Sequence, residues 1–323
     1  IDYELPAFRF APHTDARTIA WDNEVDAWGG QARFGVERLE ERIDGEGVTG
    51  GGFPIYAHED RTTNSVFGGY ERQFGEHTVR ATARRDRIGT VGSDTTGALA
   101  WGWRLDPAWL VRASYGTAFR APTFDDLYYL PPFGNPALRP EKSRGIDAAL
   151  EYHAAATLLR ATAFASRIED AIELDSAFTP RNLSTARVRG LTLDARHPLG
   201  RWALRASVTV QHTEGERVDP VDGLVEISPL SRRAPRYGSI GIERHEEQWR
   251  VGAEAIGQSR RVDTQGARMG GYAVLGLWAG YAITRDWEIF ARLSNAFDRD
   301  FETTAGYRSP PRSLYVELRY AMR

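Results

Sequence analysis

The sequence predicts an all-β fold, an antiparallel transmembrane β-barrel, and two observations carry that prediction. First, apolar and polar residues alternate with a period of two through one segment after another of the 323-residue chain. Second, the connections between these segments alternate between short turns and long polar links. Outer-membrane barrels have tight turns at one end and long loops at the other, whereas a soluble β-sandwich has no reason to sort its connections by length.

The alternation is clearest in three segments, Trp202–Gln211, Trp249–Ala255 and Trp287–Ser294. In each of them one face is apolar and the other is polar or charged, as expected of a strand with one side against lipid and the other against a wet lumen. A soluble sandwich also alternates in this way, so the lengths of the connections decide between the two folds.

Short turns are expected near Ala27–Gly30, Phe74–Glu76, Leu105–Pro107, His153–Ala156, His197–Gly200, Glu246–Gln248 and Ile283–Asp286. Long links are expected near Glu41–Thr62, Arg85–Ser93, Ala118–Arg144, Glu169–Ala186, Thr213–Pro235, Gln258–Gly271 and Ala296–Pro311. This division predicts about fifteen strands. The first lies near Thr18–Asp26 and the last near Arg312–Ala321.

Composition is compatible with such a barrel and excludes several other classes. Hydrophobic residues make up 41% of the chain, mean hydropathy is -0.46, and no apolar run approaches the roughly 18 residues that a spanning helix needs. The 9 Trp, 13 Tyr and 14 Phe are enough for aromatic girdles at the membrane interfaces. There is no cysteine, so disulfides and cysteine metal sites are excluded. A net charge of -3 gives no case for nucleic-acid binding.

The basic residues are almost all arginine, and Lys142 is the one lysine. Arginine suits the phosphates of lipopolysaccharide because its guanidinium binds them through two parallel hydrogen bonds. A coding bias toward arginine is the simpler explanation. Contact with outer-membrane lipid and lipopolysaccharide is therefore an expectation of the barrel fold, and no individual residue is assigned to it.

No catalytic or cofactor-binding pattern is found, so the chain is not expected to be an enzyme and no cofactor is expected. The seven histidines are scattered, and there is no HExxH, nucleophile elbow or phosphate loop. Two acidic clusters carry oxygen ligands of the kind that Ca²⁺ prefers, but their spacing differs from an EF-hand. We interpret both as solvated loops and assign no metal ligand. The clusters are Asp219, Asp222 and Glu226, and Asp298, Asp300 and Glu302.

The most unusual connection is a proline-rich stretch of nearly thirty residues, Ala118–Arg144. Ordered loops of this length are uncommon in compact domains and are usually functional. Its two halves read FRAPTFDDLY (Phe119–Tyr128) and GNPALRPEKS (Gly134–Ser143).

These two phrases resemble the loop signature of TonB-dependent outer-membrane receptors. Two further segments are similar to that family in order and spacing, RNLSTARVRGLTLDA (Arg181–Ala195) and LSNAFDRDFETTAGYRSPPRSLYVELRY (Leu293–Tyr320). The last is most similar to the cobalamin-receptor branch, although catecholate-siderophore receptors carry close variants. The resemblance covers Trp109 to Tyr320, about two-thirds of the chain.

The resemblance implies a bacterial outer-membrane receptor with a barrel of 22 strands and an N-terminal plug preceded by a TonB box. We therefore expect residues 1–323 to form a single transmembrane β-barrel domain, the C-terminal part of that barrel, with the plug and TonB box absent from this chain. If the last strand ends in the periplasm, every long loop is extracellular. The fragment alone is expected neither to insert stably nor to transport, because an open sheet exposes two unpaired edges.

The implied function is TonB-dependent uptake of cobalamin or a related corrinoid by a monomer. The implied partners are the TonB energy complex, reached through the plug, and a corrinoid or metal-chelate ligand. The alternatives are a ferric-siderophore receptor of the same family, a plug-less porin-like passive channel, and a soluble all-β enzyme or sandwich.

The family motifs are expected to shape loops and not to read one ligand, because they recur in receptors for different ligands. Which residues bind ligand is unknown; loop tips such as Arg181, Arg232, Arg233 and Arg268 are plausible as a group, and no single one is assigned. The motif residues are Phe119, Arg120, Ala121, Pro122, Thr123, Leu127, Tyr128, Gly134, Asn135, Pro136, Leu138, Pro140, Glu141, Ser143, Asn295, Phe297, Asp298, Gly306, Tyr307, Pro310 and Arg312. Asp125 and Asp126, beside this motif, are expected to cap local turns.

Overall fold

The computed structural model describes residues 11–46, 59–89, 91–129, 133–175, 179–182, 185–218, 224–263 and 266–321, and every structural statement below concerns these residues. They form a 16-stranded antiparallel sheet in which every strand but one pairs with its neighbours in chain order, β13 pairing only with β12. The prediction of about fifteen consecutive strands is confirmed. No helix of the described part is long and apolar enough to cross a membrane.

The strands of the main path are β1 (Ala11–Ala27), β2 (Gly30–Glu46), β3 (Glu59–Phe74), β4 (His77–Ile88), β5 (Gly92–Arg104), β6 (Trp109–Arg120), β7 (Glu141–Ala154), β8 (Thr157–Glu169), β11 (Thr185–Leu199), β12 (Trp202–Val218), β14 (Arg236–His245), β15 (Trp249–Gln258), β18 (Tyr272–Ala282), β19 (Trp287–Ser294) and β22 (Ser313–Tyr320). The connections hold α1 (Phe124–Tyr128) and the short strands β9 (Ile172–Leu174), β10 (Pro180–Asn182), β13 (Val225–Ser228), β16 (Arg261–Val262), β17 (Arg268–Met269), β20 (Glu302–Thr304) and β21 (Tyr307–Arg308).

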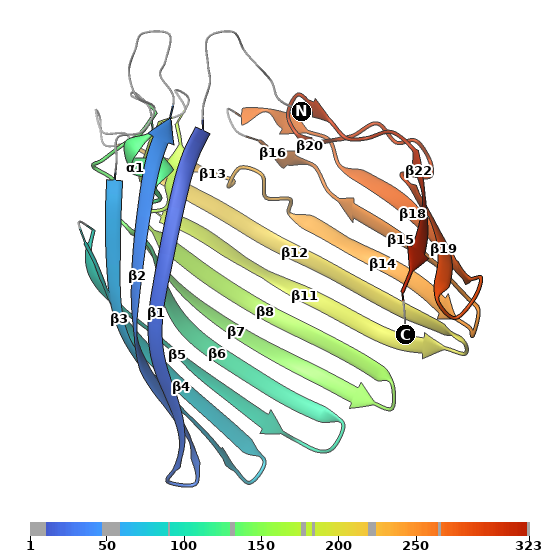
Figure 1. Cartoon of the computed structure of the whole chain (residues 1–323), viewed down its shortest axis with the longest axis horizontal. Coiled ribbons are helices and arrows are strands. Elements are labelled where there is room, and N and C mark those ends of the chain that lie inside the picture. The colour runs from blue at the N-terminus through green and yellow to red at the C-terminus, as the bar shows by residue number, and fades with distance from the viewer. Residues whose placement is uncertain are drawn as a thin grey trace.

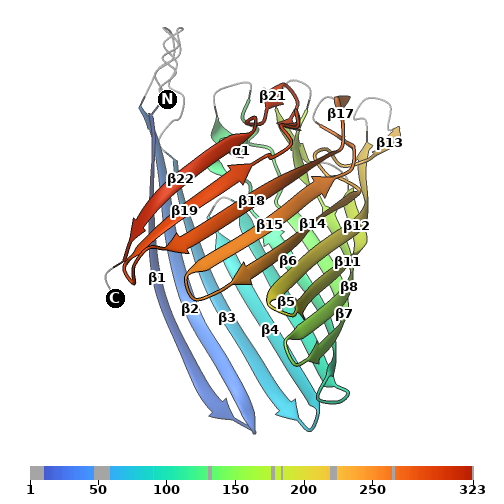
Figure 2. The ribbon, with the colours of Figure 1, turned by 90° about the vertical axis from the view of Figure 1, so that its right-hand side faces the viewer.

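The sheet curves into a wall that encloses a lumen, with β1 and β22 as its two edges (Figures 1 and 2). Within the described residues no backbone pairing joins these two strands. The short turns all lie at one end of the wall, which we call the turn end. Helix α1 and the small hairpins lie at the other, which we call the loop end (Figure 1).

The predicted turns are found where expected, and most are tight hairpins. Between Phe74 and His77 only two residues intervene, and Gly75 has a φ of +57°, a left-handed conformation that such a two-residue turn requires. Several loop-end links are shorter than predicted, although the β19–β22 connection, residues 295–312, is slightly longer. The expected long link at Arg85–Ser93 is wrong, because Arg85 and Arg87 continue the ladder opposite Thr95 and Ser93 and leave only residues 89–91 between β4 and β5.

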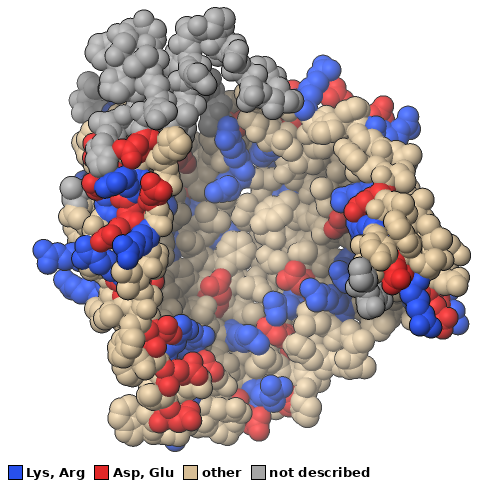
Figure 3. Space-filling model, in the orientation of Figure 1, with Lys and Arg blue, Asp and Glu red and all other residues tan. Residues whose placement is uncertain are grey.

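The burial pattern is inverted relative to a soluble domain. Many large apolar side chains are exposed, and they alternate along the strands, for example Leu191 and Leu193 on β11 and Val208 and Val210 on β12. The residues between them are polar and point to the lumen, where Thr192 and Thr209 share a hydrogen bond of 2.9 Å. Figure 3 shows the hollow interior with acidic and basic side chains on its wall. Apolar outside and polar inside is the arrangement that a lipid bilayer favours.

Aromatic rings gather near the turn end. Trp109 lies against Tyr152, and Trp287 lies against Tyr320, each pair with ring centroids 4.9 Å apart. Each of these strands begins or ends within a few residues of its turn. The expected aromatic girdle is therefore present at this end of the wall.

Candidate functional site at the mouth of the lumen

The proline-rich motif loop between β6 and β7 is an ordered structure held by its own capping groups. Thr123 caps α1: its hydroxyl accepts the backbone N–H of Asp126 at 3.0 Å, and the Asp126 carboxylate accepts the backbone N–H of Thr123 at 2.9 Å. This reciprocal capping box satisfies two backbone donors that a helix start leaves free. Phe124 and Leu127 are the buried side chains of α1.

The same loop reaches across the mouth of the lumen to β2 and β3. Arg61 on β3 donates to the carbonyl of Pro122 at 2.8 Å, and its guanidinium lies 4.7 Å from the ring centroid of Phe124. Glu41 on β2 pairs with Arg61 at 2.8 Å, and Ile43 packs against Phe124. Strands β4 and β5 separate these elements from β6 in the sheet, so the motif loop folds inward over the loop end (Figure 1).

An ion pair closes the base of the motif loop. The Nε of Arg120, the last residue of β6, donates to the Glu141 carboxylate, at the start of β7, at 2.5 Å. The other oxygen of Glu141 accepts the backbone N–H of Ile172 at 2.6 Å. Glu141 is the loop-end residue of a 14-residue strand, beyond the roughly 9–11 residues that span a bilayer. Burial acts to raise the pKa of Glu141, but the hydrogen bonds from Arg120 and Ile172 outweigh it and hold the pKa below its ordinary value.

The second half of the motif is fastened to the next loop. The Asn135 side chain donates to the carbonyl of Pro180 at 2.9 Å, and the Asn182 side chain donates to the carbonyl of Arg139 at 2.9 Å. Gly134 has no room for a side chain, because a Cβ there would lie 2.5 Å from the carbonyl oxygen of Tyr129. Asn135 and Asn182 thus join the β6–β7 connection to the β9–β10 hairpin, and Gly134 allows close packing within the β6–β7 loop.

Residues of the terminal motif divide into two groups. Asn295 and Asp298 order the β19–β22 connection: the Asn295 side chain binds both the N–H and the carbonyl of Arg299 at 2.8 Å, and Asp298 accepts the backbone N–H of Arg312 at 2.8 Å. Phe297 and Tyr307, in contrast, are 80% and 72% exposed.

Every motif residue falls in the described part of the chain, and the structure brings most of them into two loop clusters. In the cluster formed by the β6–β7 connection, Pro122, Leu127 and Leu138 are buried. Thr123 and Pro136 are exposed, and the other motif residues there are intermediate or exposed. Members not discussed above are Phe119, Ala121, Tyr128, Pro140 and Ser143 in the β6–β7 connection and its flanking strands, and Gly306 and Pro310 in the β19–β22 connection. These contacts agree with the expectation that the motifs shape loops, which stays a prediction.

A buried carboxylate that the sequence did not reveal locks three further loops together. Asp263 is 0% exposed. Its carboxylate accepts from Arg232 Nε at 2.6 Å and from the backbone N–H of Ala305 at 2.7 Å. Arg261 adds a hydrogen bond to the carbonyl of Thr303. The β15–β18 and β19–β22 loops and the segment before β14 are therefore one connected layer.

The loop-tip arginines differ in their freedom to bind a ligand. Arg181 pairs with Asp175 at 2.5 Å, and Arg232 is held by Asp263. Arg233 and Arg268 form no ion pair with another described residue. Of the four, only these two have guanidinium groups uncommitted among the described residues, although nothing in their sequence context separates them from the others.

The lumen wall below the loops carries a second buried carboxylate, Glu151 on β7, which is 2% exposed. Arg112 on β6 and Arg160 on β8 approach it to 3.2 and 3.0 Å, and His153 to 3.0 Å. Glu151, Arg112 and Arg160 line, together with Asp147, a groove of about 580 Å³ on the inner wall. This network offers a polar, charged surface to whatever fills the lumen.

No group of three or more side chains able to hold a metal ion is found among the described residues. Asp219 and Asp222 of the first acidic cluster lie outside them. In the second cluster, Asp298 and Glu302 accept backbone N–H groups of their own loop.

The chain matches a known protein family along most of its length. The family profile described as "TonB dependent receptor-like, beta-barrel" matches residues 7–296. The chain belongs to this family. It is accordingly a bacterial outer-membrane receptor barrel and not an enzyme.

The relatives that the chain resembles are named as transporters of different substances. The chain is 24% identical over 316 residues to the vitamin B12 transporter BtuB of Photobacterium profundum, a match that covers 94% of this chain and 50% of that protein. Among solved structures it resembles the copper transporter OprC, with a TM-score of 0.78 at 18% identity over 97% of this chain and 57% of that one. It also resembles the FrpB iron transporter from Neisseria meningitidis, with a TM-score of 0.79 at 14% identity over 96% of this chain and 56% of that one.

The chain thus spans about half the length of the relatives it matches. At such low identities the structural likenesses show the receptor fold alone.

Proposed function

We propose that this chain is the C-terminal wall of a TonB-dependent transporter that takes up cobalamin or a related corrinoid across the outer membrane. The observation that supports this ligand is the match to a vitamin B12 transporter along 94% of the chain. The ligand binds at the loop end, which faces the outside of the cell, and the transporter acts as a monomer.

The open edges of the sheet support the proposal that further segments complete the transporter. Strands β1 and β22 each leave a row of backbone N–H and C=O groups without a partner in the described sheet. A bilayer does not tolerate such edges, because each unsatisfied backbone group costs several kcal/mol in hydrocarbon. Additional strands close the wall, and a plug with a TonB box fills the lumen and connects the transporter to the TonB energy complex.

The loop end supports a binding role and not passive diffusion. The β6–β7 loop folds inward onto β2 and β3, and Asp263 fastens three other loops to one another. A mouth organised by fixed loops suits capture of a scarce ligand, whereas a porin-like channel needs an unobstructed entrance.

The test is ligand binding by the whole receptor, with every segment that its gene encodes, in detergent with and without calcium. Cyanocobalamin is the probe, and a ferric catecholate siderophore is the control. Saturable binding of cyanocobalamin alone supports the proposal. Binding of the siderophore alone replaces the corrinoid with an iron chelate, and binding of neither, together with ion conductance that no ligand changes, favours the passive channel.

A further inference from the structure

Four arginines lie together on the outer face of the wall, away from the lumen. Arg187 and Arg189 on β11 have the same parity as Leu191 and Leu193, which are among the exposed apolar residues of that strand. Successive residues of a strand point to opposite faces, so the two arginines and the two leucines share the face that meets lipid. The two arginines lie on the loop side of the two leucines.

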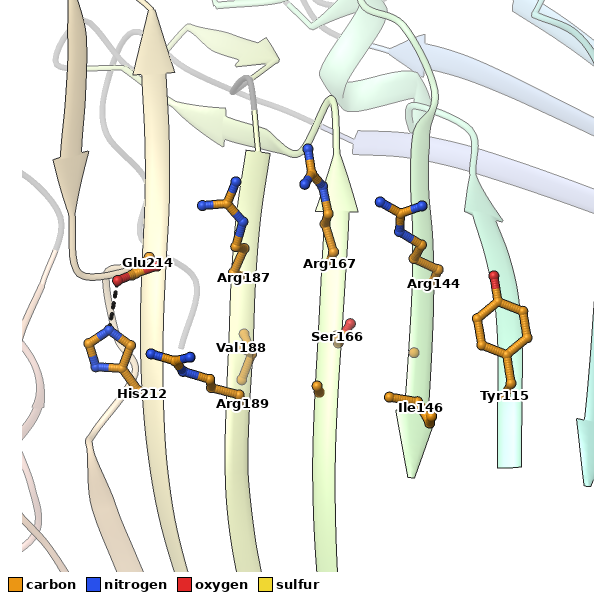
Figure 4. A pocket seen from close by; sticks show the side chains of 12 residues that line it. Tyr115, Arg144, Ile146, Ser166, Arg167, Arg187, Val188, Arg189, His212 and Glu214 are labelled. Atoms are coloured by element: carbon orange, nitrogen blue, oxygen red, sulfur yellow. Dashed lines mark hydrogen bonds and ion pairs between the residues drawn. The ribbon is translucent and has the colours of Figure 1, made fainter. Parts of the chain in front are cut away.

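Strand register extends this arrangement sideways. Arg144 on β7 is directly opposite Arg167 on β8, and Arg167 is opposite Arg187 on β11. Figure 4 shows these three guanidinium groups side by side on neighbouring strands, with Arg189 just below them. We call Arg144, Arg167, Arg187 and Arg189 the arginine patch. They line a shallow outer pocket of about 310 Å³ together with Tyr115 and Ile146.

Carboxylates near the patch engage only part of it. Glu169 lies 3.8 Å from Arg144 and 3.1 Å from Arg167, and Glu216 accepts from Arg187. Glu214, opposite Arg187, is hydrogen-bonded to His212 at 2.9 Å. Glu169 and Glu216 each lie two residues farther toward the loops than the row that Arg167, Arg187 and Glu214 form across the sheet.

The patch therefore keeps unused donor groups. Arg189 forms no ion pair or hydrogen bond with another described side chain. Each guanidinium has five N–H donors, so the paired arginines also retain several. The net charge of the four arginines and the three glutamates, Glu169, Glu214 and Glu216, is +1.

Below the patch the outer surface is apolar. Strand β8 presents only alanines there, Ala165, Ala163 and Ala161. The neighbouring strands present larger side chains, Ile146 and Leu150 on β7, with Ala148 between them, and Leu191 and Leu193 on β11; these four large side chains are exposed. Because alanine is smaller than these neighbours, the outer surface of β8 forms a low apolar strip, here called the alanine groove, along which an extended hydrocarbon chain fits.

We propose that the arginine patch and this groove bind a phosphate-bearing, acyl-chain lipid of the outer leaflet. The arginines bind the phosphate through parallel N–H···O bonds, and the alanine groove holds an acyl chain directly below. A free phosphate would use the arginines but would leave the adjoining apolar groove without a role, so the lipid is the occupant that accounts for both. The inference rests on the proposed orientation of the loop end toward the outside, but not on which ligand is transported.

The experiment compares two double variants of the whole receptor. In Arg187→Gln/Arg189→Gln the patch loses two guanidinium groups. In Arg196→Gln/Arg205→Gln two arginines facing each other on the lumen side of the same wall are lost, which gives an equal change of charge. Lipid binding is measured by native mass spectrometry in detergent with bisphosphorylated lipid A, dephosphorylated lipid A and inorganic phosphate as probes. Heat-modifiable gel migration confirms that each protein is folded, and Arg187→Lys/Arg189→Lys is measured as well.

Loss of two charge-assisted contacts is expected to weaken binding of bisphosphorylated lipid A by at least about tenfold. The lumen variant is expected to bind it like the wild type, and dephosphorylated lipid A is expected to bind weakly to all. The lysine variant keeps the charge but not the paired hydrogen-bond geometry, so its affinity for bisphosphorylated lipid A is expected to lie between those of the wild type and the Arg187→Gln/Arg189→Gln variant. Equal binding by the two double variants overturns the proposal. The proposal is also overturned if inorganic phosphate displaces bisphosphorylated lipid A at the concentration at which phosphate occupies a simple anion site, because the acyl chains would then add nothing to binding. Loss of corrinoid binding with intact lipid binding would reject the proposed transport ligand alone.

Discussion

Leu193 and Leu199 on β11 offer a direct test of which face of the wall meets lipid. Both are leucines of one strand and one face, and their exposed fractions are nearly equal, 50% and 47%. They differ in depth, because Leu193 lies near the middle of the strand and Leu199 at its turn end. We predict that Leu193→Arg destabilises the receptor much more than Leu199→Arg.

The magnitude follows from the spacing along the strand. Six residues at about 3.4 Å each separate the two positions by about 20 Å along β11. At the usual barrel tilt of about 40° this is about 15 Å along the membrane normal, or roughly half of the apolar layer. Arginine near the bilayer midplane costs about 2–4 kcal/mol and near the interface about 0–1 kcal/mol. The two variants should therefore differ by about 2–3 kcal/mol in the free energy of unfolding.

The measurement is urea-dependent folding of the whole receptor into phospholipid vesicles, followed by tryptophan fluorescence and heat-modifiable migration. Thr192→Arg serves as the control on the opposite face, where the side chain enters a polar lumen and the membrane penalty does not apply. If Leu193→Arg and Leu199→Arg destabilise the receptor equally, or if Thr192→Arg is the most harmful of the three, the assignment of faces is wrong.

Three further predictions concern the loop end. Thr123→Ala removes the capping box and should weaken α1 by about 0.5–2 kcal/mol, seen as faster proteolysis of the motif loop, whereas Thr123→Ser should behave like the wild type. The pKa of Glu141 is lowered in the folded state, so its ion pair with Arg120 stabilises the loop fully above the unfolded-state pKa of about 4.5. This stabilisation is lost as the pH falls through the pKa of the folded state. Hydrogen exchange in the loop should therefore become faster in acid, and in Glu141→Gln it should be fast at every pH. Asp263→Asn should destabilise the connected loops by about 1–3 kcal/mol, which is less than the loss of a fully buried ion pair would cost because Arg232 is half exposed. Unchanged hydrogen exchange of these loops in the variant would contradict the role of Asp263 in holding them together.

The strands and the turns can be predicted from the sequence because both depend on local pattern. Two-residue periodicity marks each strand, and residues such as Gly75 mark the tight turns. The same patterns place loop-end boundaries too early wherever charged residues continue the ladder, as at Arg85 and Arg87. A run of charges is typical of a loop, but in this wall the strands continue beyond the apolar belt and pair through charged residues.

Contacts between loops could not be predicted in the same way. Arg61 and Pro122 are 61 residues apart, and Arg232 and Asp263 are 31 apart. Only the curvature of the wall brings these segments together, and single-residue patterns do not encode it. Helix α1 has five residues, too few to show a helical period. Thr123 and Asp126 do carry the spacing of a capping box, which is the signal that could have revealed the helix.

The two ends of the outer face differ in chemistry, and this difference bears on the orientation of the barrel independently of loop length. The turn end carries aromatic rings, such as Trp109 against Tyr152, which suit the interface of any bilayer. The loop end carries a patch of arginines, which suits a leaflet rich in phosphate. Long loops and arginines thus mark the same end of the wall. A receptor inserted the other way would place the arginine patch in the periplasmic leaflet, so lipid binding by the patch and exposure of the loops on intact cells must agree.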